Sequence, residues 1–202
     1  MYDTKYEPTA GRPVNAQIRF ASITAGIALA VMAVLAPLGV MVALPSGSTG
    51  AAGLAVLAVA MLDVVVAAAL YPLLSTGGAL IAQIAVMLRI VYGAVFGAAG
   101  AVLIGTADAE LFEAMWDAGL LIFGVHLVLV GVVLFRSLAA PKWIAALTAI
   151  AGFGYLVDAV VAALGAGAAA SVAEFTFVGE VALLVWLIGW AGRPRRGEKA
   201  MA

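Results

Sequence analysis

Six long apolar segments, separated by short polar turns, make up most of this chain. They lie at about residues 20–44, 51–74, 79–106, 116–135, 143–165 and 173–191. A helix needs about 20 apolar residues to cross the hydrocarbon core of a bilayer, whereas a β-barrel strand needs only about ten with alternating polarity. Only 10% of the residues are charged, against about 25% in soluble domains. The sequence therefore predicts an all-α integral membrane protein, folded as a bundle of six transmembrane helices.

The distribution of Lys and Arg predicts how the chain crosses the membrane. If the N-terminus is cytoplasmic, nine of the ten Lys and Arg residues fall on cytoplasmic segments, and the tenth, Arg89, lies inside a span. The expected outer segments carry carboxylates instead: Asp108, Glu110, Glu113, Asp117 and Glu174. This is the positive-inside pattern. We expect both termini in the cytoplasm, with an N-terminal segment at residues 1–19, a transmembrane domain at 20–191 and a basic tail at 192–202.

Five ionisable residues interrupt the apolar spans. They are Asp63, Arg89, His126, Asp158 and Glu180. A charge at the centre of a bilayer costs roughly 2.5–3.5 kcal/mol on insertion scales, so such residues are rarely incidental. Many of their neighbours on the same helix face are Ala or Gly, and small residues mark contacts between helices in membranes. We therefore expect these side chains to point into the bundle, with Gly93 and Gly97 packing one helix closely on another.

Asp63 and Arg89 are expected to lie at the same depth. They are nearly equidistant from the turn at Thr76 and Gly77, and helices rise by about 1.5 Å per residue on both sides of it. Because Arg keeps its proton in proteins, it needs an anion, and Asp63 is the nearest by depth. The sequence predicts a buried ion pair near mid-membrane. It leaves open whether that pair is only a structural clamp or belongs to a ligand or proton site.

Asp158 and Glu180 are also expected at one depth, nearer the outer surface. Two carboxylates sharing a dry site cannot both ionise cheaply, so one of them would hold a proton. The alternative is that they are separate, each bonded to Tyr155, Thr176 or the backbone.

His126 falls between these two levels. It should be neutral if it is buried without an acid beside it, and it titrates near physiological pH if it has one. It is either part of a site or a satisfied hydrogen-bonding link between helices. With Tyr92 and Tyr155 it completes the candidate ligand or proton site, whose other members are Asp63, Arg89, Asp158 and Glu180.

Several kinds of chemistry are excluded by residue type. The chain has no Cys, and no Lys lies within a span, so a retinal Schiff base has no attachment point. A single His excludes bis-His haem ligation within one chain, and we do not expect His126 to bind haem with a methionine such as Met87. The strong metal, nucleotide and serine-hydrolase motifs are absent. We predict no metal, no cofactor and no nucleic-acid partner.

The ordered motifs of the chain resemble one known family. They are Leu62-Asp63 through Leu70-Tyr71-Pro72-Leu73-Leu74, Leu88-Arg89, Phe123-Gly124-Val125-His126, Leu134-Phe135-Arg136-Ser137, Pro141-Lys142-Trp143-Ile144, Ala151-Gly152-Phe153-Gly154-Tyr155-Leu156 and Gly179-Glu180 through Trp186-Leu187-Ile188. Together they resemble a bacterial multi-pass membrane family catalogued as domain of unknown function 4386. The resemblance implies a multi-pass protein of the bacterial plasma membrane and carries no activity.

Three functional hypotheses remain. The first is a protein that binds a small ligand or lipid, or has a proton-linked function, through His126, Asp158, Glu180 and Tyr155, with Asp63 and Arg89 as an inner support. The second is a structural or accessory subunit whose buried charges only hold helices together, within a homo-oligomer or a larger membrane complex. The third is an intramembrane lipid-modifying enzyme with Asp158 and Glu180 as acid and base. Membrane lipids are the partners expected in every case.

Overall fold

A computed structural model describes residues 14–165 and 171–193, and within them every regular element is helical. The elements are α1 (Val14–Pro37), the π-helical turn η1 (Leu38–Ala43), α2 (Thr49–Leu74), the 3-10 turn η2 (Ser75–Gly77), α3 (Ala79–Gly105), α4 (Ala109–Arg136), α5 (Lys142–Ala163), α6 (Val172–Thr176) and α7 (Val178–Gly189). Six helical stretches in these residues are long and apolar enough to cross a membrane, the last formed by α6 and α7 together. The predicted six-helix membrane bundle is confirmed. The cytoplasmic placement of both termini stays a prediction.

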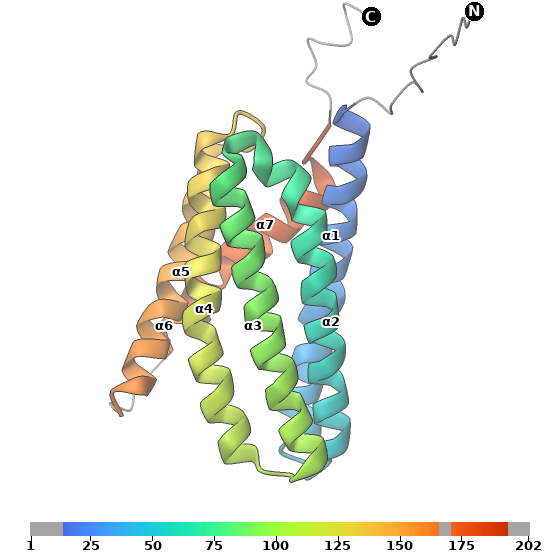
Figure 1. Ribbon diagram of the computed structural model, residues 1–202, viewed down its shortest axis with the longest axis vertical. Coiled ribbons are helices and arrows are strands. Elements are labelled where there is room, and N and C mark those ends of the chain that lie inside the picture. The colour runs from blue at the N-terminus through green and yellow to red at the C-terminus, as the bar shows by residue number, and fades with distance from the viewer. Residues whose placement is uncertain (1–13, 166–170, 194–202) are drawn as a thin grey trace, which may run out of the picture.

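The long helices are arranged as a closed ring. Each of the first five packs against the next in sequence, and α7 completes the ring by packing against both α5 and α1. The start of α1 and the end of α7, which are the termini of the described chain, lie at one end of the bundle, and α7 crosses it obliquely (Figure 1). The connections at residues 44–48 and 106–108 lie at the opposite end, which we call the distal end.

Glycines allow two of the helix pairs to approach closely. A Cβ atom added at Gly124 of α4 would lie 2.8 Å from the carbonyl oxygen of Gly152 in α5, and one added at Gly152 would lie 2.7 Å from the carbonyl oxygen of Gly124. Between α2 and α3, a Cβ at Gly93 would lie 3.1 Å from the Cβ of Asp63, and one at Gly97 would lie 3.3 Å from the Cβ of Ala60. Small residues thus bring the backbones together, as in membrane helix pairs generally.

Two helices begin earlier than the hydropathy pattern suggested. α4 starts at Ala109 and not near residue 116, because Asp108 caps it by accepting a hydrogen bond from the Leu111 amide at 2.9 Å. Glu110, Glu113 and Asp117, expected in a loop, therefore lie on the first turns of a helix. α1 likewise begins at Val14 and includes Arg19, which was assigned to the N-terminal segment.

The sixth span is not one continuous helix as expected for residues 173–191. It is broken at Phe177, between α6 and α7. Residues 1–13, 166–170 and 194–202 lie outside the described residues, and with them most of the predicted N-terminal segment, most of the predicted turn between the last two spans and most of the basic tail.

The core is divided between the two ends of the bundle. Near the termini, Leu183, Trp186 and Leu187 of α7 are buried in one cluster with Ala25 and Ala28 of α1. The Arg19 guanidinium strengthens this contact by donating hydrogen bonds to carbonyl oxygens at the end of α7 (those of Leu187, Ile188 and Ala191). The distal cluster is built from α1 to α5, and among the described residues it includes none from α6 or α7. The helices α1 and α7 therefore pack together near the termini.

Candidate functional site

A buried ion pair joins α2 to α3. Nη2 of Arg89 lies 2.6 Å from Oδ1 of Asp63. Asp63 is fully buried, and only 2% of Arg89 is exposed. The two side chains meet because α2 and α3 leave the tight turn at residues 75–78 as antiparallel neighbours with equal rise on both sides. The buried ion pair predicted from depth is confirmed.

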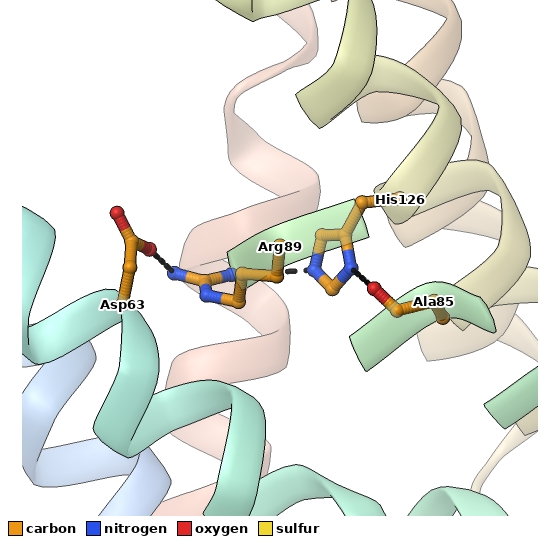
Figure 2. Close-up of polar contacts among 4 residues, drawn as sticks. All are labelled: Asp63, Ala85, Arg89 and His126. Carbon is orange, nitrogen blue, oxygen red and sulfur yellow. Dashed lines mark hydrogen bonds and ion pairs between the residues drawn. The ribbon is translucent and has the colours of Figure 1, made fainter. Parts of the chain in front are cut away.

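His126 extends this ion pair to α4. Its Nε2 lies 3.3 Å from Nη1 of Arg89, and its Nδ1 lies 2.8 Å from the carbonyl oxygen of Ala85, as Figure 2 shows. A carbonyl oxygen only accepts, so Nδ1 carries the proton, and Nε2 accepts from the guanidinium. The Arg89 guanidinium also lies over the ring of Phe123, 5.5 Å from its centroid. A polar chain from Asp63 through Arg89 to His126 thus connects three helices.

Tyr155 and Glu180 form a second polar contact, between α5 and α7. The Tyr155 hydroxyl donates to Oε1 of Glu180 at 2.6 Å. This is the only hydrogen bond that the described part of the chain provides to the Glu180 carboxylate, which is half-buried. Most of the acceptor sites of that carboxylate are therefore open to another donor.

Asp158 has a different set of partners. Its carboxylate accepts hydrogen bonds from the Ser171 hydroxyl at 2.5 Å and from the amides of Val172 and Ala173, each at 2.8 Å. These are the first amides of α6, so Asp158 of α5 acts as a cap for that short helix. Of the two interpretations of Asp158 and Glu180, the contacts match separate partners and not a carboxyl pair sharing one proton. The pairing assumed a continuous sixth helix, and the break at Phe177 removes that assumption.

A cavity of about 1040 Å³ lies beside both polar contacts. Asp63, Arg89, Tyr92, Tyr155, Asp158 and Glu180 all contribute to its wall. The structure thus brings six of the seven predicted site residues to one cavity. His126 is not part of the wall and lies behind Arg89.

Several residues of the cavity wall are exposed. One rim is formed by exposed residues at the end of α1 and in η1, Pro37 and Met41. The other is formed by exposed residues at the junction of α6 and α7, Phe177 and Val181. These two rims are apolar, whereas Asp117 and Glu174 are exposed wall residues nearer the distal end. The rims belong to α1 and α7, whose shared core cluster lies nearer the termini.

Aromatic rings make up one wall of the cavity. The Tyr92 ring lies 4.7 Å from that of Phe123, and the Phe123 ring lies 5.2 Å from that of Tyr155, measured between centroids. Phe96 continues the wall to Trp116, with 5.5 Å between their centroids. The carboxylate of Glu180 is bonded to the end of this aromatic series, through the Tyr155 hydroxyl.

Some wall residues were not predicted as part of a site. Trp116 was not among the candidate residues and Asp117 was assigned to an outer segment, yet both line the cavity. The spacing in the sequence indicates this position for Trp116, because Trp116, Leu120 and Phe123 follow i, i+4, i+7 spacing and share a helix face. In the described residues, Oδ2 of Asp63, Nε of Arg89 and Nε1 of Trp116 are buried without a hydrogen-bond partner. No group of three or more His, Asp or Glu residues in that part of the chain is arranged to hold a metal ion.

Comparison with known proteins places the chain in a family. A family model described as domain of unknown function (DUF4386) matches residues 100–189. An uncharacterized protein of Archaeoglobus fulgidus is 38% identical over 128 residues, which are 63% of this chain and 76% of that protein. The chain belongs to the DUF4386 family. The matched residues of the DUF4386 model include His126, Tyr155, Asp158 and Glu180 but not the Asp63–Arg89 pair. No solved structure matches the chain.

Proposed function

We propose that this DUF4386 protein binds an amphiphilic molecule in the cavity bordered by α1 and by α6 and α7. The observation that carries the proposal is a space of about 1040 Å³ with a largely apolar wall and a few polar groups. Ligand sites for small molecules have volumes of about 300–1,000 Å³ and the same division between apolar walls and a few orienting polar groups. The apolar body of the ligand would lie against α1, with its polar end towards Tyr155 and Glu180.

The membrane is the source of the ligand in this proposal. The rims of the cavity at Pro37, Met41, Phe177 and Val181 are exposed and apolar. A transmembrane helix presents such residues to hydrocarbon, so a molecule dissolved in the bilayer would reach the cavity without crossing water. We further propose a bacterial plasma-membrane location with cytoplasmic termini, supported by the bias of Lys and Arg towards the expected inner segments.

The Asp63–Arg89–His126 chain serves as the fixed back of the site. Each member has a partner within the chain, and the three residues come from three different helices. Such a chain holds α2, α3 and α4 in register beside the cavity, whose other wall residues come from α1 and from α5 to α7. The structural interpretation of the ion pair and the binding function are therefore compatible.

Native mass spectrometry of the purified protein in a neutral detergent tests the proposal. We expect a bound amphiphile, either co-purified or added as decanol, on the wild-type protein. Ala33→Phe, which adds a ring at a cavity-lining position of α1, should reduce the bound fraction by roughly tenfold or more, the effect of removing well-fitted apolar contacts. Ala94→Phe, at an exposed position of α3 outside the cavity wall, is the matched control and should bind as the wild type does.

Two outcomes would contradict this function. The first is the absence of any bound amphiphile on the wild-type protein. The second is equal binding by the wild type, Ala33→Phe and Ala94→Phe, which would place bound molecules on the outer surface of the bundle. Either result, together with a stable protein partner after purification at native abundance, would favour an accessory subunit.

A further inference from the structure

We propose that the ligand of this cavity is an organic cation, an amine or quaternary ammonium group attached to an apolar body. The inference rests on the proposed binding function and names the class of molecule that the site would take. Its polar end would lie beside Glu180 and the aromatic wall. Three properties of the described residues support it: the charge of the cavity wall, the unused acceptor sites of Glu180 and the aromatic rings that line the cavity beside that carboxylate.

The described cavity wall carries more negative than positive groups. Its single basic residue is Arg89, whereas its acidic residues are Asp63, Asp117, Asp158, Glu174 and Glu180. Arg89 is already paired with Asp63 at 2.6 Å and bonded to His126 at 3.3 Å. Asp158 is satisfied by three donors at the start of α6. The carboxylates that remain are Asp117, Glu174 and Glu180, and no basic side chain in the described wall balances them.

Glu180 is the deepest of these three carboxylates along the helices. It is half-buried on α7, whereas Asp117 and Glu174 are exposed near the distal end. Its single donor within the described chain is the Tyr155 hydroxyl. A carboxylate held in a low-dielectric site stabilises a positive charge placed beside it far more than it would in water. A cation of the ligand would supply the counter-charge that the described part of the protein does not supply.

The aromatic wall favours the same charge. Phe123 contacts both Tyr92 and Tyr155, with centroid distances of 4.7 and 5.2 Å, and all three rings line the cavity. The negative faces of aromatic rings attract cations, and cages of such rings are the known receptors of quaternary ammonium groups. The cation–π contact of Arg89 with Phe123 shows that this wall already accepts one positive group.

An anionic ligand fits these features poorly. Its charge would face Glu180 and the two carboxylates nearer the distal end, and like charges across a binding site oppose association. The charge of Arg89 is already balanced by Asp63 at 2.6 Å, so an anion would meet no unpaired positive charge in the described wall. The cationic nitrogen could come from a free lipophilic amine or from a lipid head group, and both sources share the chemistry that the wall would recognise.

Competition binding with amphiphiles of one chain length tests the charge preference. Decyltrimethylammonium, decanol and decyl sulfate are titrated against the full-length protein in a neutral detergent, and bound ligand is counted by native mass spectrometry. The cation should bind on the order of tenfold or more tightly than decanol, the effect of a desolvated cation–π and carboxylate site. Decyl sulfate should bind more weakly than decanol. A short-chain phosphatidylcholine added as competitor distinguishes the lipid source, since it should displace decyltrimethylammonium only if a lipid head group fits.

Glu180→Gln assigns the preference to one carboxylate. This variant keeps the size of the side chain and an oxygen for the Tyr155 hydroxyl but removes the charge. We expect it to lose most of the preference for the cation over decanol while still binding decanol. Glu113→Gln, an exposed position of α4 outside the cavity wall, is the matched control and should keep the preference.

The outcomes separate this inference from the proposed function. Equal binding of the three amphiphiles, a preference for the sulfate, or an unchanged preference in Glu180→Gln would overturn the cationic assignment and leave the binding function standing. If none of the three binds to the wild-type protein, both fail. The wild-type series decides the charge preference even if Glu180→Gln does not fold.

Discussion

Arg89 and Asp63 are ion-paired across the α2–α3 contact, with 2.6 Å between Nη2 and Oδ1 and almost no exposure of either side chain. Two opposite charges in a low-dielectric interior compensate each other, whereas one alone leaves an uncompensated charge. Gly93 lies against Asp63 at this contact, so the backbones are close enough for the pair to form without extended side chains. The ion pair is therefore part of the packing contact between α2 and α3.

Removal of one partner should be more harmful than removal of both. We expect Arg89→Met to lower the free energy of unfolding by about 3–5 kcal/mol, because Asp63 is left buried and unpaired. The double variant Arg89→Met with Asp63→Leu should recover most of that loss. Unfolding by SDS titration in mixed micelles compares the wild type, Arg89→Met, Asp63→Leu and the double variant, which together form a double-mutant cycle. Strictly additive effects would contradict the interpretation of a coupled pair.

The tautomer of His126 follows from its two contacts. Since Nδ1 lies 2.8 Å from a carbonyl oxygen and Nε2 lies 3.3 Å from a guanidinium nitrogen, the proton belongs on Nδ1. His126 is the only histidine, so ¹⁵N NMR of a histidine-labelled sample reports it without assignment. The spectrum should show a protonated Nδ1 and an unprotonated Nε2 at neutral pH. The reverse tautomer would contradict the bond to the Ala85 carbonyl.

Arg19 should stabilise the last turn of α7. Its guanidinium donates to the carbonyl oxygens of Leu187 at 3.1 Å and Ala191 at 3.0 Å, groups that have no further helical partner. Arg19→Gln should cost about 1–2 kcal/mol, from lost charge-assisted bonds and a lost favourable charge at a helix C-terminus. Hydrogen exchange of the Trp190 and Ala191 amides should become faster. Arg136→Gln, an exposed change at the end of α4, should leave those amides unaffected.

Asp158 should stabilise the first turn of α6. Asp158→Ala removes the acceptor of the Val172 and Ala173 amides, and loss of a helix cap costs about 0.5–2 kcal/mol. We expect faster hydrogen exchange at these two amides with little change in α3. Asp117→Ala serves as a control, because it removes a cavity carboxylate that caps no helix. Unchanged exchange in Asp158→Ala would exclude the capping role.

Gly152 should tolerate no side chain. A Cβ there would lie 2.7 Å from the Gly124 carbonyl oxygen and 2.7 Å from the Val128 amide nitrogen, so α4 and α5 would have to separate. Gly152→Ala should destabilise the protein by about 1–3 kcal/mol, the usual effect of overpacking. At Gly50, on the first turn of α2, an added Cβ meets no atom within 4 Å. Thermal unfolding should therefore show Gly50→Ala as neutral or slightly stabilising.

The elements that depend on local pattern could be predicted from the sequence. Span number follows from the length of apolar runs, and the Asp63–Arg89 pair follows from equal rise on two helices joined by a tight turn. The same counting left two arrangements open for Asp158 and Glu180, a shared proton or separate partners, because depth alone does not identify hydrogen-bond partners. Asp158 instead caps the start of α6 from α5, a contact between helices that a one-dimensional pattern does not contain.

The cavity could not be predicted from the sequence, because it depends on how the helices pack together. It exists because α7 packs against α1 near the termini while the distal cluster includes no described residue of α7, and helix tilt is set by packing between neighbours. Individual residues of the cavity wall could be identified from the sequence. Tyr155 and Glu180 were candidates, and Trp116 shares a helix face with Phe123. The space between them is a property of the assembled ring.

Crystals of the protein grown with an ω-bromoalkyl trimethylammonium compound would show where the cation binds, because the anomalous signal locates the bromine. We predict density for the ammonium group beside Glu180 and Tyr155, with the bromine peak inside the cavity near the distal part of α1. A cavity closed by α1 packing along the whole of α7, or a bromine peak only on the outer surface of the bundle, would contradict the proposed site.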